Sequence, residues 1–491
     1  MNFNSGAFLI FLPVVTAGYW LLPYRFRKYW LLAASYFFYM YWNPWLIFPF
    51  LFSTAVDYFC GLGIEKYRGN KPVMKALLLT SVCLNLSLLF SFKYLDFFGE
   101  TVNQIFAMLS LPLRIPKFGL ILPVGITFYT YQTMSYTIDV YRGDFHAERD
   151  LVTFALYVSY FPQLVAGPIE NPGNLLPQLR REQKLNWEDL TAGGRLLISG
   201  YFRKCVVADL CGIYVNRVFA HMDQANSLTI MLAGALFCIQ MYCDFAGYSE
   251  IAAGAARLMG VRLMRNFDRP YLSQSYTEFF RRWHISLNRW FTQYVYIPLG
   301  GSRKGKVRKI MNIFVVFTLC GLWHGANWTY VLWGIYAAFW LCLESLTLKP
   351  MEQAAAAHKI DLKHPVVKLL RRGTTFLIFI PAALLFRAVS VEQLGVIFPR
   401  LVSQWGFGHE YLQSTLQALG LDAEQILRLV LCIVAMAGLH RWGQYDLPRP
   451  ETNHQMARSV SATVYYILII ALCWLALLAT QDVAGFAYFQ F

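Results

Sequence analysis

Two histidines, His284 and His324, stand forty positions apart in stretches that are otherwise largely apolar. A neutral imidazole has an unperturbed pKa of about 6.5, so it can accept a proton from a hydroxyl group near neutral pH. Ionisable groups at the depth of a bilayer are expensive to bury, and they usually line a water-filled cavity or a reaction channel. We therefore expect the chemistry of this protein to take place within the membrane.

Polar residues cluster around the first histidine. In a helix, Asn288 would share a face with His284, and Arg281 would lie one turn earlier beside them. The wider segment 241–299 is too polar for helices that face lipid, so we expect it to line a cavity or its cytoplasmic mouth. The residues of this segment that could bind a substrate are Asp244, Ser249, Arg281, Arg282 and Asn288.

The second histidine lies between a tryptophan and a glycine, in Trp323-His324-Gly325. The glycine lets backbone or substrate approach closely. The indole of Trp323 can wall a slot for an extended acyl thioester. A membrane histidine taken alone is often only an interhelical hydrogen-bond donor, and this interpretation stays open for His284 and for His324.

The composition of the chain is that of a membrane protein. Apolar residues make up 57% of its 491 residues and charged residues only 14%, which is too apolar for a soluble chain of this length. We expect an all-α polytopic protein with about 11 to 13 crossings, some of them short and re-entrant. The first span has no cleavage site, so we expect it to remain as a first helix. The long apolar runs are 8–22, 77–92, 228–245, 310–322, 328–343, 374–386, 426–439 and 462–479.

The formal net charge of the chain is +15, but its basic residues occur in clusters between apolar runs rather than along one face. Lys and Arg accumulate in cytoplasmic loops, so membrane topology explains this charge better than binding to nucleic acid does. We expect the lipid bilayer, and no nucleic acid, as a partner. The clusters are 25–28, 66–75, 180–184, 303–309 and 349–372.

The apolar runs and the basic clusters divide the chain into four segments. We expect N-terminal transmembrane helices in 1–110 and a catalytic core with cytoplasmic re-entrant segments in 111–348. A cytoplasmic linker in 349–372 would follow, rich in Lys, His and Ala. The segment 373–491 would add further transmembrane helices and an aromatic tail.

Other chemistries lack their motifs. The run Gly300–Val307 imitates a P-loop, but valine stands where Ser or Thr must reach Mg²⁺; a supporting role in attracting phosphates of the acyl donor stays open for this basic loop. Neither a G-x-S-x-G elbow nor an H-E-x-x-H pair occurs, and the ten cysteines have no metal-ligand spacing. We expect neither a bound metal nor a bound cofactor.

Several motifs closely resemble those of the membrane-bound O-acyltransferase family, in particular its bacterial branch of alginate O-acetyltransferases. The resemblance covers nearly the whole chain and is strongest between residues 120 and 345. It implies a disk of tilted helices around a central channel, which the acyl donor enters from the cytoplasm and the acceptor hydroxyl from outside. The motifs that carry it are Phe161–Ile169, Asp244–Ser249, Asn266–Leu272, Arg281–Leu287, Tyr296–Gly301 and Gly321–Gly325.

The resemblance also assigns roles to the two histidines. His324 matches the catalytic histidine of the family, and His284 matches a second histidine of this branch. We interpret His324 as the general base that takes a proton from the attacking hydroxyl, typically for about 10²–10⁴-fold in rate. His284 or Asn288 could hydrogen-bond the thioester carbonyl oxygen as charge develops on it.

By the same resemblance, acetyl-CoA is the expected acyl donor and an O-acetylated cell-surface polysaccharide is the expected product. An extracytoplasmic acetyltransferase or esterase-like partner protein would finish the transfer. The chain would be a multi-pass protein of the bacterial cytoplasmic (inner) membrane. Its tail, Phe486–Phe491, resembles a tail of these polysaccharide acetyltransferases, so we expect Tyr488 to carry the acyl group transiently. An interfacial aromatic anchor is the alternative.

Two other functions stay open. One is transfer of D-alanine from a carrier protein to teichoic acid, against which the additional C-terminal helices and the tail stand. The other is a transporter or flippase. Such folds often contain inverted repeats, and no internal repeat is visible in this sequence. The ion-coupling groups of a transporter would be Asp57, Asp139, Asp244, Glu250 and Glu344.

Overall fold

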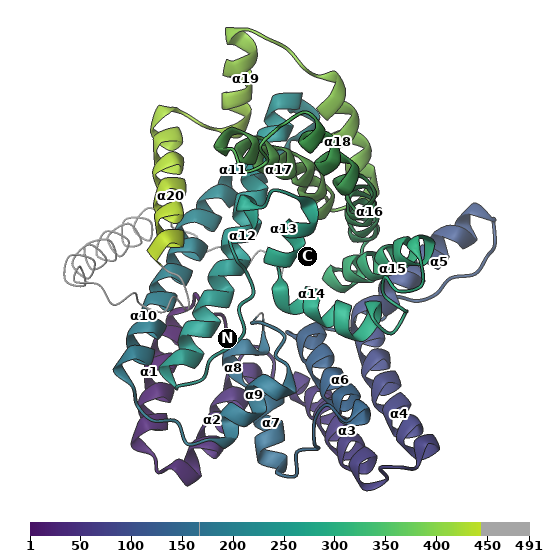
Figure 1. Ribbon diagram of the computed structural model, residues 1–491, viewed down its shortest axis with the longest axis vertical. Helices are drawn as coiled ribbons and strands as arrows, with labels where there is room; N and C mark the ends of the chain where they lie inside the picture. Colours follow the sequence, from purple (N-terminus) through teal and green to yellow (C-terminus); the bar gives the residue numbers. More distant parts are fainter. Residues whose placement is uncertain (166, 443–491) are drawn as a thin grey trace. The chain divides into compact units, whose positions relative to one another are not determined.

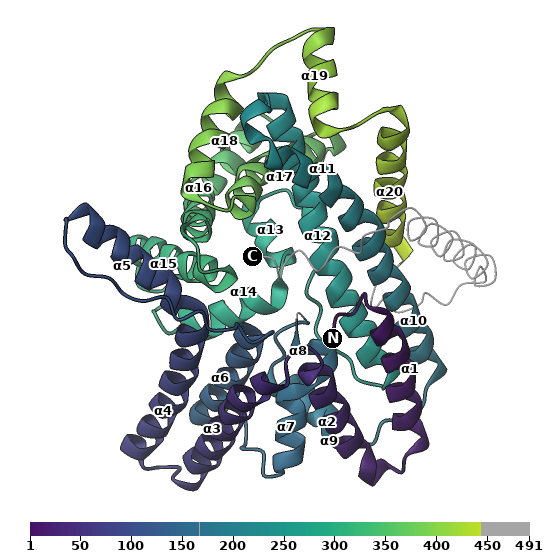
Figure 2. The same ribbon diagram turned by 180° about the vertical axis from the view of Figure 1, so that it is seen from behind.

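The computed structural model describes residues 1–165 and 167–442, and the regular elements in that part of the chain are all helices. Figure 1 and Figure 2 follow these helices from opposite sides. Seven of the eight apolar runs fall on described helices, and the run 462–479 lies outside the described residues. The expected all-α membrane fold is therefore confirmed.

Within the described residues, six helices are long and apolar enough to cross a membrane. A further apolar helix, α1 (Gly6–Leu21), has 16 residues. The expectation of about 11 to 13 crossings also counted short and interrupted segments. The six helices are Pro44–Lys66, Lys71–Met108, Ser227–Leu258, Lys306–His324, Trp328–Leu348 and Pro365–Arg387.

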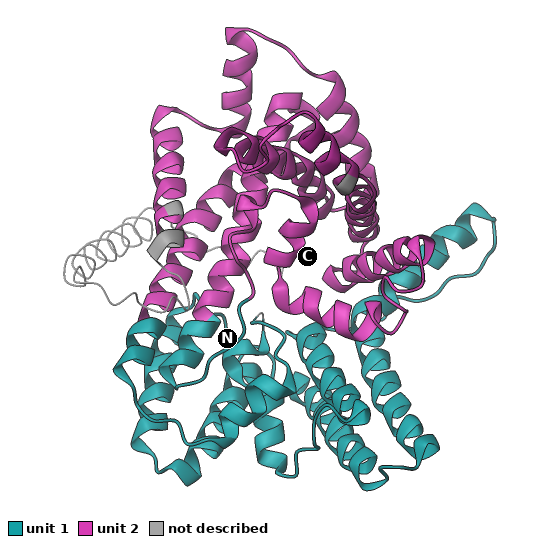
Figure 3. Cartoon of the chain, viewed as in Figure 1, with its two compact units in different colours: residues 1–193, 252–265 teal, residues 194–251, 266–491 magenta. Residues whose placement is uncertain are grey.

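The chain forms two compact units, which Figure 3 colours separately. Unit 1 comprises residues 1–193 and 252–265, so it includes the beginning of α10 and the end of α12. Its other helices are α1, α2 (Tyr24–Met40), η1 (Pro44–Leu46), α3 (Ile47–Lys66), α4 (Lys71–Leu89), η2 (Phe90–Tyr94), α5 (Leu95–Met108), α6 (Ile126–Arg142), α7 (Leu151–Ser159), α8 (Phe161–Leu164) and α9 (Pro172–Arg180).

Unit 1 has a buried polar cluster among α3, α4 and α6, which lie side by side in Figure 1. Asp57 of α3 accepts hydrogen bonds from Ser81 and from Asn85 Nδ2 of α4, the latter at 2.8 Å. It also accepts one from Thr137 Oγ1 of α6 at 2.9 Å. Lipid supplies no hydrophobic drive between such helices, so close packing and hydrogen bonds of this kind hold them together.

Unit 2 comprises residues 194–251 and the chain from 266 onward. Its first helices cross at two glycines: a Cβ on Gly200 would lie 2.6 Å from the carbonyl oxygen of Gly247. Its elements are α10 (Trp187–Tyr201, second part), η3 (Phe202–Ala208), α11 (Asp209–Ala220), η4 (Met222–Gln224), α12 (Ser227–Leu258), η5 (Pro270–Leu272), α13 (Tyr276–Arg282), α14 (Ile285–Phe291), η6 (Thr292–Tyr296), α15 (Lys306–His324), α16 (Trp328–Ala357), α17 (Pro365–Arg387), α18 (Val391–Ser403), α19 (His409–Leu419) and α20 (Ala423–Trp442).

Helices α15 and α16 pack against each other at unusually short range. A Cβ added to Gly321 would lie 2.2 Å from the carbonyl oxygen of Tyr330, and one added to Gly334 would lie 2.3 Å from the carbonyl oxygen of Phe317. Small residues at a crossing allow two membrane helices to bring their backbones together. These two glycines therefore set the separation of α15 and α16.

We expect Gly334→Ala to lower the midpoint of thermal unfolding of the purified protein in detergent. The added methyl group would overlap a backbone oxygen, which cannot turn aside as a side chain can, and overpacking of this kind costs about 1–3 kcal/mol. Gly373→Ala in α17 is the matched control, because no atom lies within 4 Å of the place that its added methyl group would take. That variant should melt at or above the wild-type midpoint. Equal midpoints for the two variants would contradict the close approach.

Candidate active site

His324 is the last residue of α15, and its partly buried ring lies among aromatic side chains. The ring centroid is 5.0 Å from that of Trp323, 5.1 Å from that of Trp333 on α16 and 5.1 Å from that of Phe386 on α17. All three contacts are edge-to-face, an arrangement that aromatic rings favour. Three helices thus hold this imidazole in an apolar setting.

The packing of the turn after His324 explains why residue 325 is a glycine. A Cβ on Gly325 would lie 2.1 Å from the ring of Tyr330, so only glycine fits. Two residues later, Asn327 caps α16 by accepting a hydrogen bond from Thr329 N at 3.1 Å. The neighbour that requires glycine here is the side chain of Tyr330, whereas the sequence predicts backbone or substrate.

His284 is 2% exposed and stands between two short helices, α13 and α14. Its backbone is left-handed, with φ 44° and ψ 55°, and Trp283 before it is extended. The expectation that His284 and Asn288 share one helical face with Arg281 is therefore wrong. A positive φ breaks the helix at the histidine, and such a conformation in a non-glycine residue is a frequent mark of a functional site.

The side chain of Asn288 closes the end of α13. Its Nδ2 donates to the carbonyl oxygen of Phe280 at 2.7 Å and to that of Trp283 at 2.6 Å. Both amide hydrogens are thus already donated to main-chain oxygens. Arg281 is exposed, and Arg282 pairs with Glu278 at 2.7 Å one turn earlier in α13.

Asn266 fixes the imidazole of His284. Its Oδ1 lies 3.1 Å from His284 Nδ1 and accepts a hydrogen bond from Ser286 Oγ at 2.9 Å. An accepting oxygen at this place assigns the proton to Nδ1 and leaves the lone pair on Nε2. Burial lowers the pKa of His284 to about 3, so the ring is neutral at physiological pH.

The indole of Trp323 brings the two histidines together. Its ring centroid lies 5.4 Å from that of His284 and 5.0 Å from that of His324. Trp323 itself is 1% exposed. The ring centroid of Phe245 lies 4.7 Å from that of His284. One buried indole therefore contacts both imidazoles that the sequence singled out.

The remaining predicted binding residues, Asp244 and Ser249, lie on α12 and are buried. Asp244 pairs with Lys204 Nζ of η3 at 3.0 Å. Ser249 Oγ accepts a hydrogen bond from Asn266 Nδ2 at 3.2 Å, so it belongs to the hydrogen bonds that orient His284. Both side chains make contacts within the protein, and their part in binding substrate stays a prediction.

Other acidic groups in unit 2 also have structural partners. Glu250 pairs with Arg203 of η3 at 3.0 Å and accepts a hydrogen bond from Ser199. Glu344 accepts from the backbone nitrogens at the start of α13, Tyr276 and Thr277, at 2.9 and 2.7 Å. Asp57 of unit 1 is hydrogen-bonded in a similar way. Because these acids hold helices together, they are poorly suited to be the ion-coupling groups of a transporter.

The sequence did not single out Trp333, Phe386 or Asn266 as site residues. Trp333 is 3% exposed, and its Nε1–H has no acceptor among the described residues. Tryptophan in an apolar helix gives no signal of a polar contact, so only the contact with His324 reveals it. Asn266 stood in the polar segment, but the spacing of residues did not pair it with His284.

The described part of the chain thus combines helices that can span a membrane with two histidines that contact one buried indole, which are candidate catalytic groups in a membrane protein. The chain belongs to the membrane-bound O-acyltransferase family, whose sequence model matches residues 31–361. It is therefore a multi-pass membrane O-acyltransferase, as the resemblance of its motifs implied. Family membership leaves no support for the transporter hypothesis.

Three relatives illustrate the similarity. The chain is 34% identical to the probable alginate O-acetylase AlgI of Pseudomonas putida over the full length of both chains. It is 33% identical to the peptidoglycan O-acetyltransferase of Helicobacter pylori over 68% of each chain. It is 26% identical to the teichoic acid D-alanyltransferase of Bacillus subtilis over 48% of this chain and 62% of that one.

Proposed function

We propose that this enzyme moves an acetyl group from cytoplasmic acetyl-CoA across the bacterial cytoplasmic membrane for O-acetylation of a cell-surface polysaccharide. The names of two similar proteins, an alginate O-acetylase and a peptidoglycan O-acetyltransferase, support a polysaccharide acceptor. An extracytoplasmic acetyltransferase or esterase-like partner completes the transfer. The observation that carries the proposal is the imidazole of His324, held among aromatic rings beside Trp323 and His284.

In this proposal His324 acts as the general base. It takes the proton of the acceptor hydroxyl while the hydroxyl oxygen attacks the thioester carbonyl. The C–O bond forms, the C–S bond breaks, and the same proton passes to the leaving thiolate of CoA. Three aromatic rings hold the His324 imidazole in place as the base that this step requires.

The developing negative charge on the carbonyl oxygen needs a hydrogen-bond donor. Asn288 uses both amide hydrogens on main-chain oxygens, and His284 directs its Nδ1–H to Asn266. The indole of Trp333 contacts His324 and has a buried N–H with no acceptor among the described residues. We assign the donor role to Trp333, and to His284 the placement of Trp323.

We expect His324→Ala to reduce transfer of labelled acetyl from acetyl-CoA to surface polymer by about 10²–10⁴-fold, the usual contribution of a general base. The assay measures CoA thiol release by membranes and acetate on the polymer. His358→Ala, in the exposed residue after α16, is the matched control and should keep wild-type rates.

Two outcomes of that assay would count against the proposal. Wild-type activity in the His324→Ala variant would remove the general base. Transfer of D-alanine from a carrier protein, with no turnover of acetyl-CoA, would favour the teichoic acid reaction named for the Bacillus subtilis relative.

We expect Trp333→Phe to lower kcat by about 10²–10³-fold, as loss of one donor to a developing oxyanion typically does, with little change in KM. Phenylalanine keeps an aromatic ring at this position but removes the N–H together with part of the indole ring, so the control must lose the same part. Trp340→Phe on the same helix is the control, because the Trp340 ring contacts Tyr336 and Phe339 instead. Equal loss in both variants, or a loss confined to KM, would contradict the donor role.

Tyr488 lies outside the described residues, and its role follows from the likeness of the tail alone. In the proposed relay the hydroxyl that attacks the thioester is the phenol of Tyr488, which then carries the acetyl group as an ester. The hydroxyl of the final acceptor attacks this ester, and its proton passes to the leaving phenolate. We expect Tyr488→Phe, which keeps the ring and removes the nucleophile, to abolish acetylation of the polymer while membrane insertion is unchanged. Unchanged acetylation would leave the interfacial anchor as the function of this residue.

A further inference from the structure

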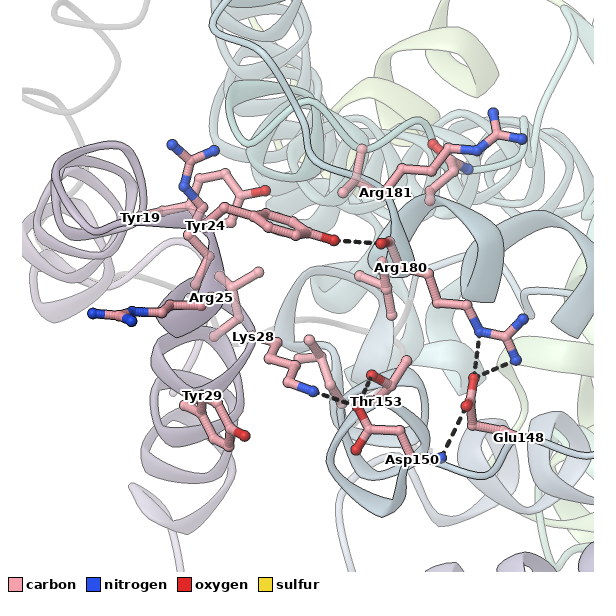
Figure 4. Close-up of a pocket in the computed structure, with 16 residues that line it drawn as sticks. Tyr19, Tyr24, Arg25, Lys28, Tyr29, Glu148, Asp150, Thr153, Arg180 and Arg181 are labelled. Atoms are coloured by element: carbon pink, nitrogen blue, oxygen red, sulfur yellow. Dashed lines mark hydrogen bonds and ion pairs between the residues drawn. The ribbon is translucent and has the colours of Figure 1, made fainter.

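A pocket of about 490 Å³ lies within unit 1, among residues that the proposed acyl transfer does not use. Figure 4 shows the side chains that line it. They come from the end of α1, the first turns of α2, the start of α7 and the end of α9. The volume falls in the range of small-ligand sites, about 300–1,000 Å³.

Positive charge exceeds negative charge in the lining of this pocket. Asp150 pairs with Lys28, and Glu148 accepts from Arg180 Nε at 2.6 Å, so both acids are neutralised. The lining basic residues are Arg25, Arg27, Lys28, Arg180 and Arg181, and the lining acids are Glu148 and Asp150. Three cationic groups are therefore not balanced by an acid of the pocket.

The contacts of these three arginines leave their charge available. Arg27 donates to the carbonyl oxygens of Leu22 and Gln183, at 3.1 and 2.9 Å, and Arg25 lies 4.8 Å from the centroid of the Phe26 ring. Arg181 is exposed. Among the residues that the structure describes, no carboxylate pairs with any of the three. In Figure 4, Arg25 and Arg181 stand on opposite sides of the pocket.

The two basic segments are fixed to each other although about 150 residues separate them. Tyr24 donates its hydroxyl hydrogen to the carbonyl oxygen of Arg180, the contact drawn across the pocket in Figure 4. The positive-inside pattern assigns both segments to the cytoplasmic side. Exposed apolar side chains flank the pocket residues in sequence, with Leu21 84% and Phe26 46% exposed. Tyrosines, basic groups and exposed apolar surface together are typical of the headgroup level of a membrane.

We propose that this pocket binds the phosphate of an anionic phospholipid headgroup of the cytoplasmic leaflet, such as phosphatidylglycerol. Arginine matches phosphate oxygens with two parallel N–H donors, and Arg25 and Arg181 supply such donors from opposite sides of the lining. The exposed apolar side chains beside the pocket suit the acyl chains of a lipid, whereas the phosphates of CoA bring no such chains. A lipid headgroup bound in this pocket would connect the turn between α1 and α2 with the end of α9.

The test uses the full chain purified in detergent, with lipid binding measured by native mass spectrometry and by the thermal shift on lipid addition. We expect phosphatidylglycerol to bind and to raise the melting midpoint more than phosphatidylcholine does. The double variant Arg25→Gln with Arg181→Gln should bind phosphatidylglycerol about 25-fold more weakly, roughly fivefold for each charge removed near the membrane surface. Neither arginine has an ion pair with a described residue to lose, so the lipid-free midpoint should stay unchanged.

A matched double variant, Lys71→Gln with Lys75→Gln, removes two exposed charges outside the pocket and should bind as the wild type does. Equal binding of the two lipids, or equal weakening by both double variants, would overturn the proposal in favour of unspecific charge attraction. A third arm adds 3′,5′-ADP and inorganic phosphate. If 3′,5′-ADP alone gives the shift that the Arg25 and Arg181 variant loses, the pocket serves a nucleotide and the lipid assignment is wrong.

Discussion

Edge-to-face packing around the imidazole of His324 is the interaction on which the proposed chemistry depends. The rings come from α16 and α17, so the site exists only while those helices stay close to the end of α15. Gly321 and Gly334 permit that closeness, because any side chain there would meet a carbonyl oxygen. Close helix packing at the glycines and placement of the His324 ring are thus one requirement, since a wider separation of α15 and α16 would move Trp333 away from the imidazole.

Two buried charge pairs join helices of unit 2. Lys204 and Arg203 are neighbours in the π-helical segment η3, and each meets an acid of α12, Asp244 and Glu250. A charge in an apolar interior is tolerated when an opposite charge and hydrogen bonds compensate it, and removal of one partner is costly. Asp244 and Glu250 belong to the polar segment 241–299, which the sequence predicted to line a cavity. Much of the polarity of this segment instead connects helices to one another.

The features that depend on composition and on family motifs could be predicted from the sequence. Composition predicted the all-α membrane fold, and the family motifs drew attention to the two histidines, which the structure places in contact with Trp323. The break between α13 and α14 could not be predicted, because a spacing of four residues predicts a shared helical face and carries no sign of a positive φ at His284. The pairing of Asn266 with His284 and the approach of Trp333 to His324 were also missed, since both arise from folding of segments that are apart in the chain.

The left-handed backbone at His284 limits what can replace this histidine without a second effect. Most side chains cost roughly 1–2 kcal/mol in that conformation, whereas asparagine shares histidine's tolerance of it. An alanine scan at this position therefore combines loss of the ring with distortion of the chain between two helices. Replacement by asparagine would remove the ring and keep the backbone conformation, so it separates these two effects. Natural variants that keep the loop geometry would have histidine, asparagine, aspartate or glycine at this position.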